Sequence, residues 1–212
     1  MVSYLTVLEK GNWEQVIEKS RFIALVFPVK TPDEINQALE QARQLYPNAR
    51  HYVYAYRLYK GKLERSTDDG EPQGTGGRPV LDVLQFRELW DVLVVVIRYF
   101  GGILLGTGGL TRAYGGTARQ LLDQLEVSRL VPHTIYEVES GYNWYETLKY
   151  QYRLKNWVTG NEEFSATVKV EVFIREEERQ KFEEWLTDFT QREVTFQEKG
   201  NIMRAEPARP RF

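Results

Sequence analysis

The sequence predicts an α+β protein with two domains. The chain has 212 residues, of which 42% are hydrophobic and 13% aromatic, so it can bury a core. Segments with helical spacing of apolar residues alternate with strand-like segments, and this pattern restarts near residue 130. At about 100–200 residues per domain the length allows one or two domains. The restart favours two, at residues 1–130 and 134–204.

The first expected elements are a strand and a helix. The residue pattern from Ser20 to Val29 predicts a strand. The segment TPDE at 31–34 marks a helix start, because Thr caps the first amides, Pro fits the first turn and Glu closes a capping box. The helix should run to about Tyr46. Its expected apolar face is Ile35, Ala38, Leu39, Ala42 and Leu45.

The rest of the first domain adds strands and helices in turn. We predict strands at 51–59 and 62–67 joined at Lys60-Gly61, and a short helix from Pro79. A buried strand at 92–97 and a helix from about 110 to 125 complete the domain. Because the two long helices each have a single apolar stripe, we predict a two-layer sandwich.

The second domain has the element order βαββαβ, which is typical of a ferredoxin-like fold. After a linker at 128–132 we predict strand 134–141, helix 143–154, strands 155–159 and 163–174, helix 176–190 and strand 192–199. Gly160-Asn161 is the expected hairpin turn. Residues 203–212 are basic with two prolines, which favours a frayed tail over a phosphate-binding arm.

Composition excludes several classes of function. A net charge of −2 argues against a protein that coats nucleic acid by global attraction, so any such contact must be local. No segment approaches the ~20 continuous apolar residues of a membrane span, so we expect a cytoplasmic protein with no membrane partner. With no cysteine and two histidines, disulfides, thiolate metal sites and three-histidine zinc centres are excluded, and we expect no cofactor.

A glycine-rich segment at 98–116, RYFGGILLGTGGLTRAYGG, follows the buried strand and opens a helix. Glycine permits positive φ and close backbone approach, and the first amides of a helix attract anions. The segment lacks the third glycine of a dinucleotide-binding loop and the lysine of a P-loop. We therefore predict an anionic or backbone ligand near Gly101, Gly102, Gly106, Thr107, Gly108 and Gly109.

A long polar segment at 64–79, ERSTDDGEPQGTGGRP, is the second candidate, since long ordered loops are commonly functional. Asp68, Asp69 and Glu71 can hold Mg²⁺ or dock basic groups of a partner. The structural alternative is a solvated turn, because Asp-Gly is a common turn pair. Metal binding is the less favoured use, and we assign no metal ligands.

Arg98 and Arg112 flank the glycine-rich loop. A helix N-terminus contributes only about 0.3–1 kcal/mol to anion binding, whereas millimolar affinity needs about 4 kcal/mol. The arginines would supply the difference, because the planar guanidinium suits phosphate or carboxylate. Alternatively, either arginine pairs with an acidic residue of segment 64–79 and locks the two loops together.

The strand at 51–59 carries a histidine and three tyrosines. His51 has no acid or nucleophile beside it, so it is a weak catalytic candidate and the catalytic residues stay unassigned. Tyr52, Tyr54 and Tyr56 alternate with apolar residues, which gives the strand an aromatic face. Such a face can stack nucleotide bases, but aromatic side chains more often cover a sheet.

Together these segments resemble the Impact family, in its bacterial, YigZ-like branch. The resemblance covers the whole chain and rests on SRFI at 20–23, DDGEPxGTxG at 68–77 and RYFGGxxLGTGGLxRAYGG at 98–116. It implies the domain-two fold of the fifth small-subunit ribosomal protein, followed by a domain similar to one of elongation factor G. It also adds Arg21 and His51 to the expected binding residues.

This chain departs from the family pattern at two positions. Members often carry Cys where it has Val53, and Lys where it has Leu104. Roles that need either side chain therefore do not transfer, and thiol chemistry is excluded.

The function we predict is a non-enzymatic regulator or accessory factor of translation, and most of this follows from the resemblance. It would engage RNA, the ribosome or a protein partner through the first-domain loops and use the second domain as a further docking surface. The alternative is an enzyme or sensor that binds a small phosphorylated ligand at the Gly106–Arg112 loop, with Asp68 or Asp69 holding Mg²⁺.

Overall fold

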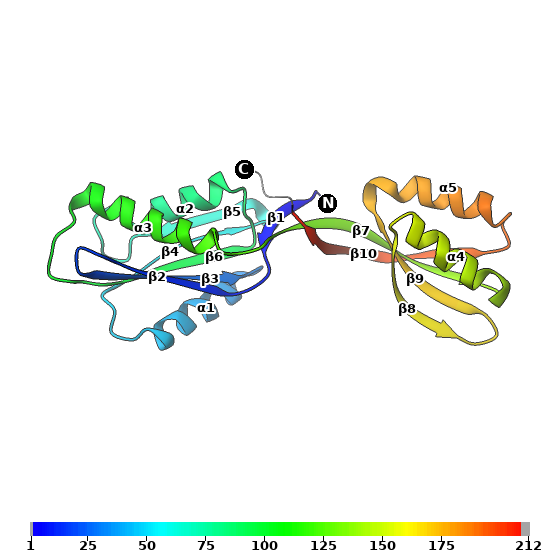
Figure 1. Cartoon of the computed structure of the whole chain (residues 1–212), viewed down its shortest axis with the longest axis horizontal. Coiled ribbons are helices and arrows are strands. Elements are labelled where there is room, and N and C mark those ends of the chain that lie inside the picture. Colours follow the sequence, from blue (N-terminus) through cyan, green and yellow to red (C-terminus); the bar gives the residue numbers. More distant parts are fainter. Residues whose placement is uncertain (1, 209–212) are drawn as a thin grey trace. The chain divides into compact units, whose positions relative to one another are not determined.

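The computed structural model describes residues 2–208, which form two compact units. Tyr4–Arg129 make up the first unit and Leu130–Glu206 the second. Each unit combines helices with strands (Figure 1). The predicted α+β class with two domains is therefore confirmed.

The first unit contains a five-stranded sheet in the order β2-β3-β6-β4-β5. Its strands are β2 (Gly11–Ile17), β3 (Ser20–Pro28), β4 (His51–Leu58), β5 (Leu63–Thr67) and β6 (Val92–Tyr99). Neighbouring strands are antiparallel, and Arg98 lies opposite both Phe22 and His51. Directly opposed side chains share a sheet face, so these three residues point to the same side.

Helices cover both faces of this sheet: α1 (Pro32–Leu45), α2 (Gly77–Phe86) and α3 (Gly106–Leu122). α1 packs on one face, and α2 and α3 pack on the other (Figure 1). The unit therefore has three layers instead of the predicted two. The reason lies in β3 and β6, which carry apolar side chains on both sides and are buried along almost their whole length.

The sequence predicts the start of α1 more accurately than the start of α3. α1 begins at Pro32, with Thr31 accepting a hydrogen bond from the Glu34 N–H, although Leu45 is exposed. α3 begins at Gly106, earlier than the predicted start near Leu110. The buried face of the helix begins only at Leu110, and the added turn at Gly106–Gly109 is exposed or half-buried, so the sequence pattern of apolar residues does not include it.

The second unit has the predicted βαββαβ order. Its elements are β7 (Val127–Ser140), α4 (Tyr142–Leu154), β8 (Val158–Phe164), β9 (Val168–Arg175), α5 (Arg179–Phe189) and β10 (Thr195–Pro207). Within this unit the strands run in the order β7-β9-β8, and β10 also pairs with β7. The short strand β1 (Tyr4–Val7) belongs to the first unit. One core cluster, which includes Tyr136, Phe182 and Leu186, joins both helices to a single sheet face.

Three predicted boundaries in the second half are wrong. Gly160-Asn161 lies inside β8, at a register shift, and the hairpin turn is at 165–167. Glycine in a strand commonly marks such an irregularity. The expected linker at 128–132 is part of β7. β10 extends through residues 203–207 because β7 supplies its backbone partners, whereas residues 209–212 of the expected tail lie outside the described residues.

Within residues 2–208, no helix combines the length and the apolar character needed to cross a lipid bilayer.

Candidate functional site

The acidic loop at 68–76 is shaped by Asp68. Its carboxylate accepts hydrogen bonds from the N–H groups of Gly74, Gly76 and Gly77, at 2.7, 2.9 and 2.8 Å. Burial raises the pKa of Asp68, but the three N–H donors outweigh it and hold the pKa below its ordinary value. Because α2 begins at Gly77, Asp68 caps that helix.

Asp69 connects the loop to the start of β4. Its carboxylate accepts a hydrogen bond from the Tyr52 N–H at 2.6 Å, and its carbonyl oxygen lies 2.8 Å from Nδ1 of His51. Asp68 and Asp69 thus serve the loop itself, which removes the support for a Mg²⁺ site there. Among residues 2–208, no group of three or more potential metal ligands occurs.

Glu71 is the residue of the acidic loop whose side chain is buried in the first unit. Its side chain is 5% exposed, and Oε1 accepts hydrogen bonds from Arg98 Nη1 and the Tyr114 hydroxyl, both at 2.7 Å. Nε2 of His51 lies 3.8 Å from the same oxygen. We call Glu71, Arg98, Tyr114 and His51 the Glu71 cluster. Burial and the bond to Glu71 raise the pKa of Tyr114, so its hydroxyl stays a proton donor.

Ser20 extends this cluster to the glycine-rich segment. Its Oγ accepts hydrogen bonds from Nη2 of Arg98 at 3.3 Å and from the N–H of Gly101 at 3.2 Å. A Cβ on Gly101 would lie 2.0 Å from the Lys19 backbone, so the close approach requires glycine. Of the two uses considered for Arg98, the structure contains the internal pairing with an acidic residue.

Arg21 lies on the opposite sheet face from Arg98. Its guanidinium donates to both carboxylate oxygens of Glu14, at 2.6 and 2.8 Å, and stands over the rings of Tyr46 and Tyr99. Since neighbouring residues in a strand point to opposite faces, Arg21 and Phe22 are separated in this way. Arg21 therefore does not join the other predicted binding residues.

The tyrosines of β4 cover the sheet. Tyr56 is buried in the core under α1, and Tyr52 and Tyr54 pack at its edge. Ring faces that pack on this core are not free to stack on nucleotide bases.

The middle of the glycine-rich segment, at 102–104, faces outward. Ile103 and Leu104 are 36% and 86% exposed. They lie between Gly102 and Gly106, whose φ angles of 86° and 67° favour glycine. Leu105 instead packs against the core beneath α3. The loop is thus anchored by Leu105 and presents its two preceding side chains to solvent.

This loop lines a groove of about 440 Å³. Ile103, Leu104, Leu105, Ile17 and Ala113 form its apolar lining, and Glu18, Gly109 and Arg112 complete it. Within residues 2–208, exposed Arg112 has no hydrogen-bond or ion-pair partner. α3 begins here without a side-chain cap or an acidic residue in its first turn. Below, "the groove" means these eight residues.

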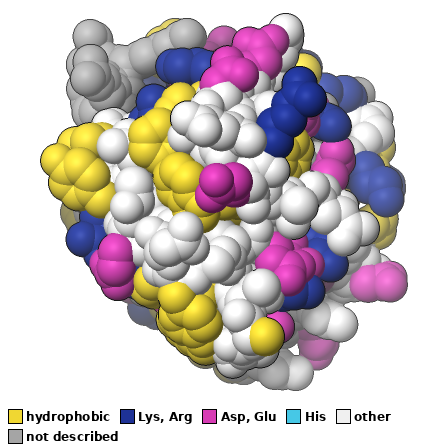
Figure 2. Space-filling view, turned by 90° about the vertical axis from the view of Figure 1, so that its right-hand side faces the viewer, with side chains coloured by type: hydrophobic (Ala, Val, Ile, Leu, Met, Phe, Trp, Pro, Cys, Tyr) yellow, Lys and Arg dark blue, Asp and Glu magenta, His cyan; other side chains and the backbone are white. Residues whose placement is uncertain are grey.

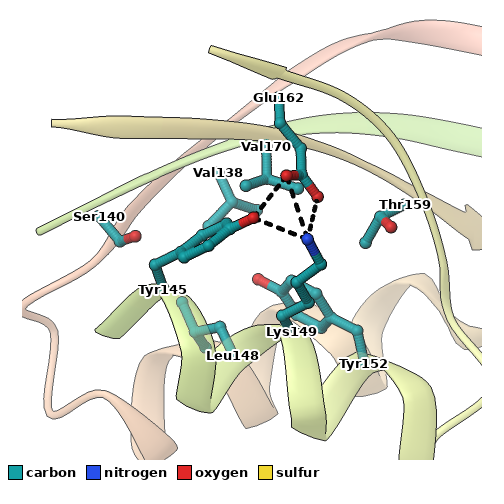
Figure 3. Close-up of a pocket in the computed structure, with 9 residues that line it drawn as sticks. All are labelled: Val138, Ser140, Tyr145, Leu148, Lys149, Tyr152, Thr159, Glu162 and Val170. Carbon is teal, nitrogen blue, oxygen red and sulfur yellow. Dashed lines mark hydrogen bonds and ion pairs between the residues drawn. The ribbon is translucent and has the colours of Figure 1, made fainter. Parts of the chain in front are cut away.

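A small cavity in the second unit has different properties (Figure 3). It lies between α4 and the sheet, and its volume of about 10 Å³ fits one water molecule. Lys149 Nζ pairs with a Glu162 oxygen at 2.9 Å and donates to the Tyr145 hydroxyl at 2.7 Å. Hydrogen bonds from Tyr145 and Lys149 lower the pKa of Glu162. These three groups satisfy one another, whereas the buried hydroxyl of Tyr152, which also lines the cavity, has no partner within residues 2–208. The small volume excludes any ligand larger than a water molecule.

The structure divides the predicted binding residues into three places. The first place is the Glu71 cluster and its edge, which hold His51, Glu71, Arg98 and Gly101. Arg21 lies on the other sheet face. The third place is the start of α3 at the groove, with Gly106, Thr107, Gly108, Gly109 and Arg112. Sequence reasoning missed Tyr114, although it lies within the quoted RAYGG motif. It also missed Ile17 and Glu18, which carry no local signal because the fold alone brings them to the loop.

Comparisons with known proteins match nearly the whole chain. The Impact N-terminal domain matches residues 18–122, and a domain of unknown function, DUF1949, matches residues 138–191. IMPACT family member YvyE of Bacillus subtilis is 37% identical over 206 residues, which cover 93% of this chain and 95% of that protein. IMPACT family member YigZ of Escherichia coli is 38% identical over 148 residues, covering 68% of this chain and 72% of that protein.

A solved structure shares the fold. It is described as the crystal structure of a hypothetical protein, is 31% identical and superposes with a TM-score of 0.62. The superposition covers 92% of this chain and 97% of that one.

Proposed function

Because this chain belongs to the Impact family, we propose that it is a cytoplasmic, translation-associated factor that acts by binding a macromolecule rather than by catalysis. The contact is made by the outward half of the glycine-rich segment, at the groove. The family resemblance supports the link to translation, and the geometry of the groove supports binding.

One observation carries the proposal: exposed apolar side chains stand beside an unpaired arginine in a segment that is otherwise used to build the fold. Leu104 is almost fully exposed, and Arg112 has no partner within residues 2–208. An exposed apolar loop that is rigidly anchored and borders a groove is typical of an interaction site.

The acid–base groups nearest the segment support binding over catalysis. The Glu71 carboxylate is occupied by Arg98 and Tyr114, and Asp68 is occupied by backbone N–H groups. A general acid or base must reach a substrate proton, and these groups are turned into the fold. For the same reason Asp68 and Asp69 offer little support to the Mg²⁺-assisted binding of a phosphorylated ligand.

Surface charge supports a local contact. On the face of the second unit that Figure 2 shows, Lys and Arg side chains are interspersed with Asp, Glu and hydrophobic ones. Proteins that bind nucleic acid through a broad surface concentrate Lys and Arg on one face. The groove in the first unit is therefore the better candidate for the primary contact.

The test is sedimentation of the full chain with bacterial ribosomes and their subunits at low salt. Gly108→Glu places a charged side chain at the start of α3, where a Cβ meets no atom within 4 Å, so the fold is kept. Gly116→Glu is the matched control, because its Cβ is also free of contacts and lies in the same helix. We expect the wild type and Gly116→Glu to sediment with ribosomes and Gly108→Glu to remain at the top. A wild-type chain that never associates would refute the proposal.

A further inference from the structure

We infer that the groove binds a protein segment in which a large apolar side chain stands next to a carboxylate. The inference deepens the proposed function, because it names the class of partner that the same groove accepts.

The apolar lining favours a protein over an RNA. Ile103 and Leu104 are exposed, and they adjoin Ile17 and Ala113 in the groove. Aliphatic surface of this kind gains free energy when it is covered by another apolar side chain. A sugar-phosphate backbone laid across these aliphatic side chains would lose water from its charges, and Arg112 is the one cation of the groove lining that could compensate.

The loop is fixed in its binding conformation before any partner arrives. Leu105 packs into the core, and glycines with left-handed φ stand on both sides of residues 103–105. A Cβ on Gly109 would lie 2.9 Å from the Cβ of Leu105, so glycine there makes room for the anchor. A preformed loop lowers the entropy cost of association.

The charges of the groove fit one carboxylate. Arg112 lines it and has no partner in the described part of the chain, and its planar guanidinium matches a carboxylate in a bidentate contact. Glu18 is the acidic residue of the lining and disfavours a second carboxylate near it. RNA binding draws its affinity from several phosphate contacts, whereas the groove lining holds a single cation.

The experiment selects random twelve-residue peptides, displayed on phage, against the full chain. Phage that bind the double variant Leu104→Ser/Arg112→Gln are removed from the library first, because their peptides bind outside the groove. We expect the enriched peptides to share a large apolar residue within two positions of Asp or Glu. A consensus rich in Lys or Arg, or no enrichment, would overturn the inference.

Single variants then test each contact with a synthetic peptide of the enriched sequence, measured by fluorescence anisotropy. We expect Leu104→Ser and Arg112→Gln each to weaken binding by about tenfold or more, the usual effect of losing a charge-assisted or apolar anchor. Phe86→Ser is the matched control for an exposed apolar residue, since Phe86 is 90% exposed and lies outside the groove. Arg119→Gln is the control for an exposed arginine of α3. Equal losses in the controls would also overturn the inference.

The failure of this inference is distinguishable from failure of the proposed function. Ribosome association that is lost in Gly108→Glu but kept in Arg112→Gln and Leu104→Ser would retain the function and reject the apolar–carboxylate partner. If the association constant falls by about 0.7 log unit for each phosphate contact when the salt concentration rises tenfold, the association is a phosphate contact with RNA. A peptide consensus without ribosome association would retain the groove and reject the link to translation.

Discussion

The two halves of the glycine-rich segment differ in what surrounds them. In the first half, Arg98 is buried and pairs with Glu71 and Ser20, and Gly101 lies against the Lys19 backbone and donates to Ser20, although the Phe100 side chain is 43% exposed. In the second half, Ile103 and Leu104 are exposed and Arg112 has no partner within residues 2–208, whereas Leu105 and Leu110 anchor this half on the core. One continuous motif thus contains a part that stabilises the fold and a part whose side chains are exposed to solvent. Substitutions in the first half should therefore reduce stability, and substitutions in the second half should reduce binding.

Glu71→Ala should have the largest effect. It leaves the Arg98 guanidinium, 6% exposed, without its carboxylate partner. Removing one member of a buried ion pair costs about 3–5 kcal/mol, and urea unfolding followed by circular dichroism measures this loss. The matched control is Glu14→Ala, which removes an exposed partner from Arg21 and should cost under about 1 kcal/mol. Similar losses for both variants would show that burial of the Glu71 cluster does not matter.

Gly101→Ala should have the next largest effect. The new methyl group would lie 2.0 Å from the Lys19 backbone, so β3 or the loop must move. Overpacking of this kind costs about 3 kcal/mol, seen as a lower urea midpoint. Gly108→Ala, in the outward half, meets no atom within 4 Å. It should be neutral or stabilise by up to about 1 kcal/mol, because alanine favours helix. A destabilised Gly108→Ala would contradict the division into two halves.

Asp68→Asn should cost about 1 kcal/mol near neutral pH, through the weaker cap on α2. The pKa of Asp68 is lower in the folded chain than in the unfolded one, because three N–H groups stabilise its charge. Its stabilising contribution is therefore complete above its ordinary pKa of 3.8 and is lost as pH falls through the lower folded value. Urea unfolding, measured from about pH 6 to about pH 3, gives the free energy of unfolding at each pH. This free energy should fall less steeply with decreasing pH in Asp68→Asn than in the wild type. Parallel declines would mean that the carboxylate is not held by the loop.

Leu104→Ser should have the smallest effect on stability. The side chain is 86% exposed, so the unfolding free energy should change by no more than about 0.5 kcal/mol. The same urea measurement checks this. A larger loss would show that Leu104 packs within the fold, and would remove its role in binding.

The sequence predicts those elements whose signals are local. TPDE at 31–34 starts α1 because capping involves only neighbouring residues. The sequence predicts the start of α3 too late, because the glycines at 106, 108 and 109 have poor helix propensity and the buried face begins only at Leu110. Gly160-Asn161 predicts a turn wrongly, because a Gly-Asn pair fits both a hairpin turn and a strand irregularity.

The candidate site was predictable only in part, for the same reason. Arg98 and an acidic residue of the other loop were expected to pair or to bind a ligand, but residues 27 positions apart offer no local clue to which acid is chosen. The exposure of Leu104 against the burial of Leu105 was equally hidden, because adjacent leucines look alike in sequence.

Hydrogen–deuterium exchange of the chain, alone and with bacterial ribosomes, tests the division of the glycine-rich segment most directly. We expect amides at 98–101 to exchange slowly in both samples. Amides at 103–109, which precede the hydrogen-bonded turns of α3, should exchange rapidly in the free chain and slowly in the complex. Protection on binding that spares 103–109, or that appears only in the second unit, would contradict the account.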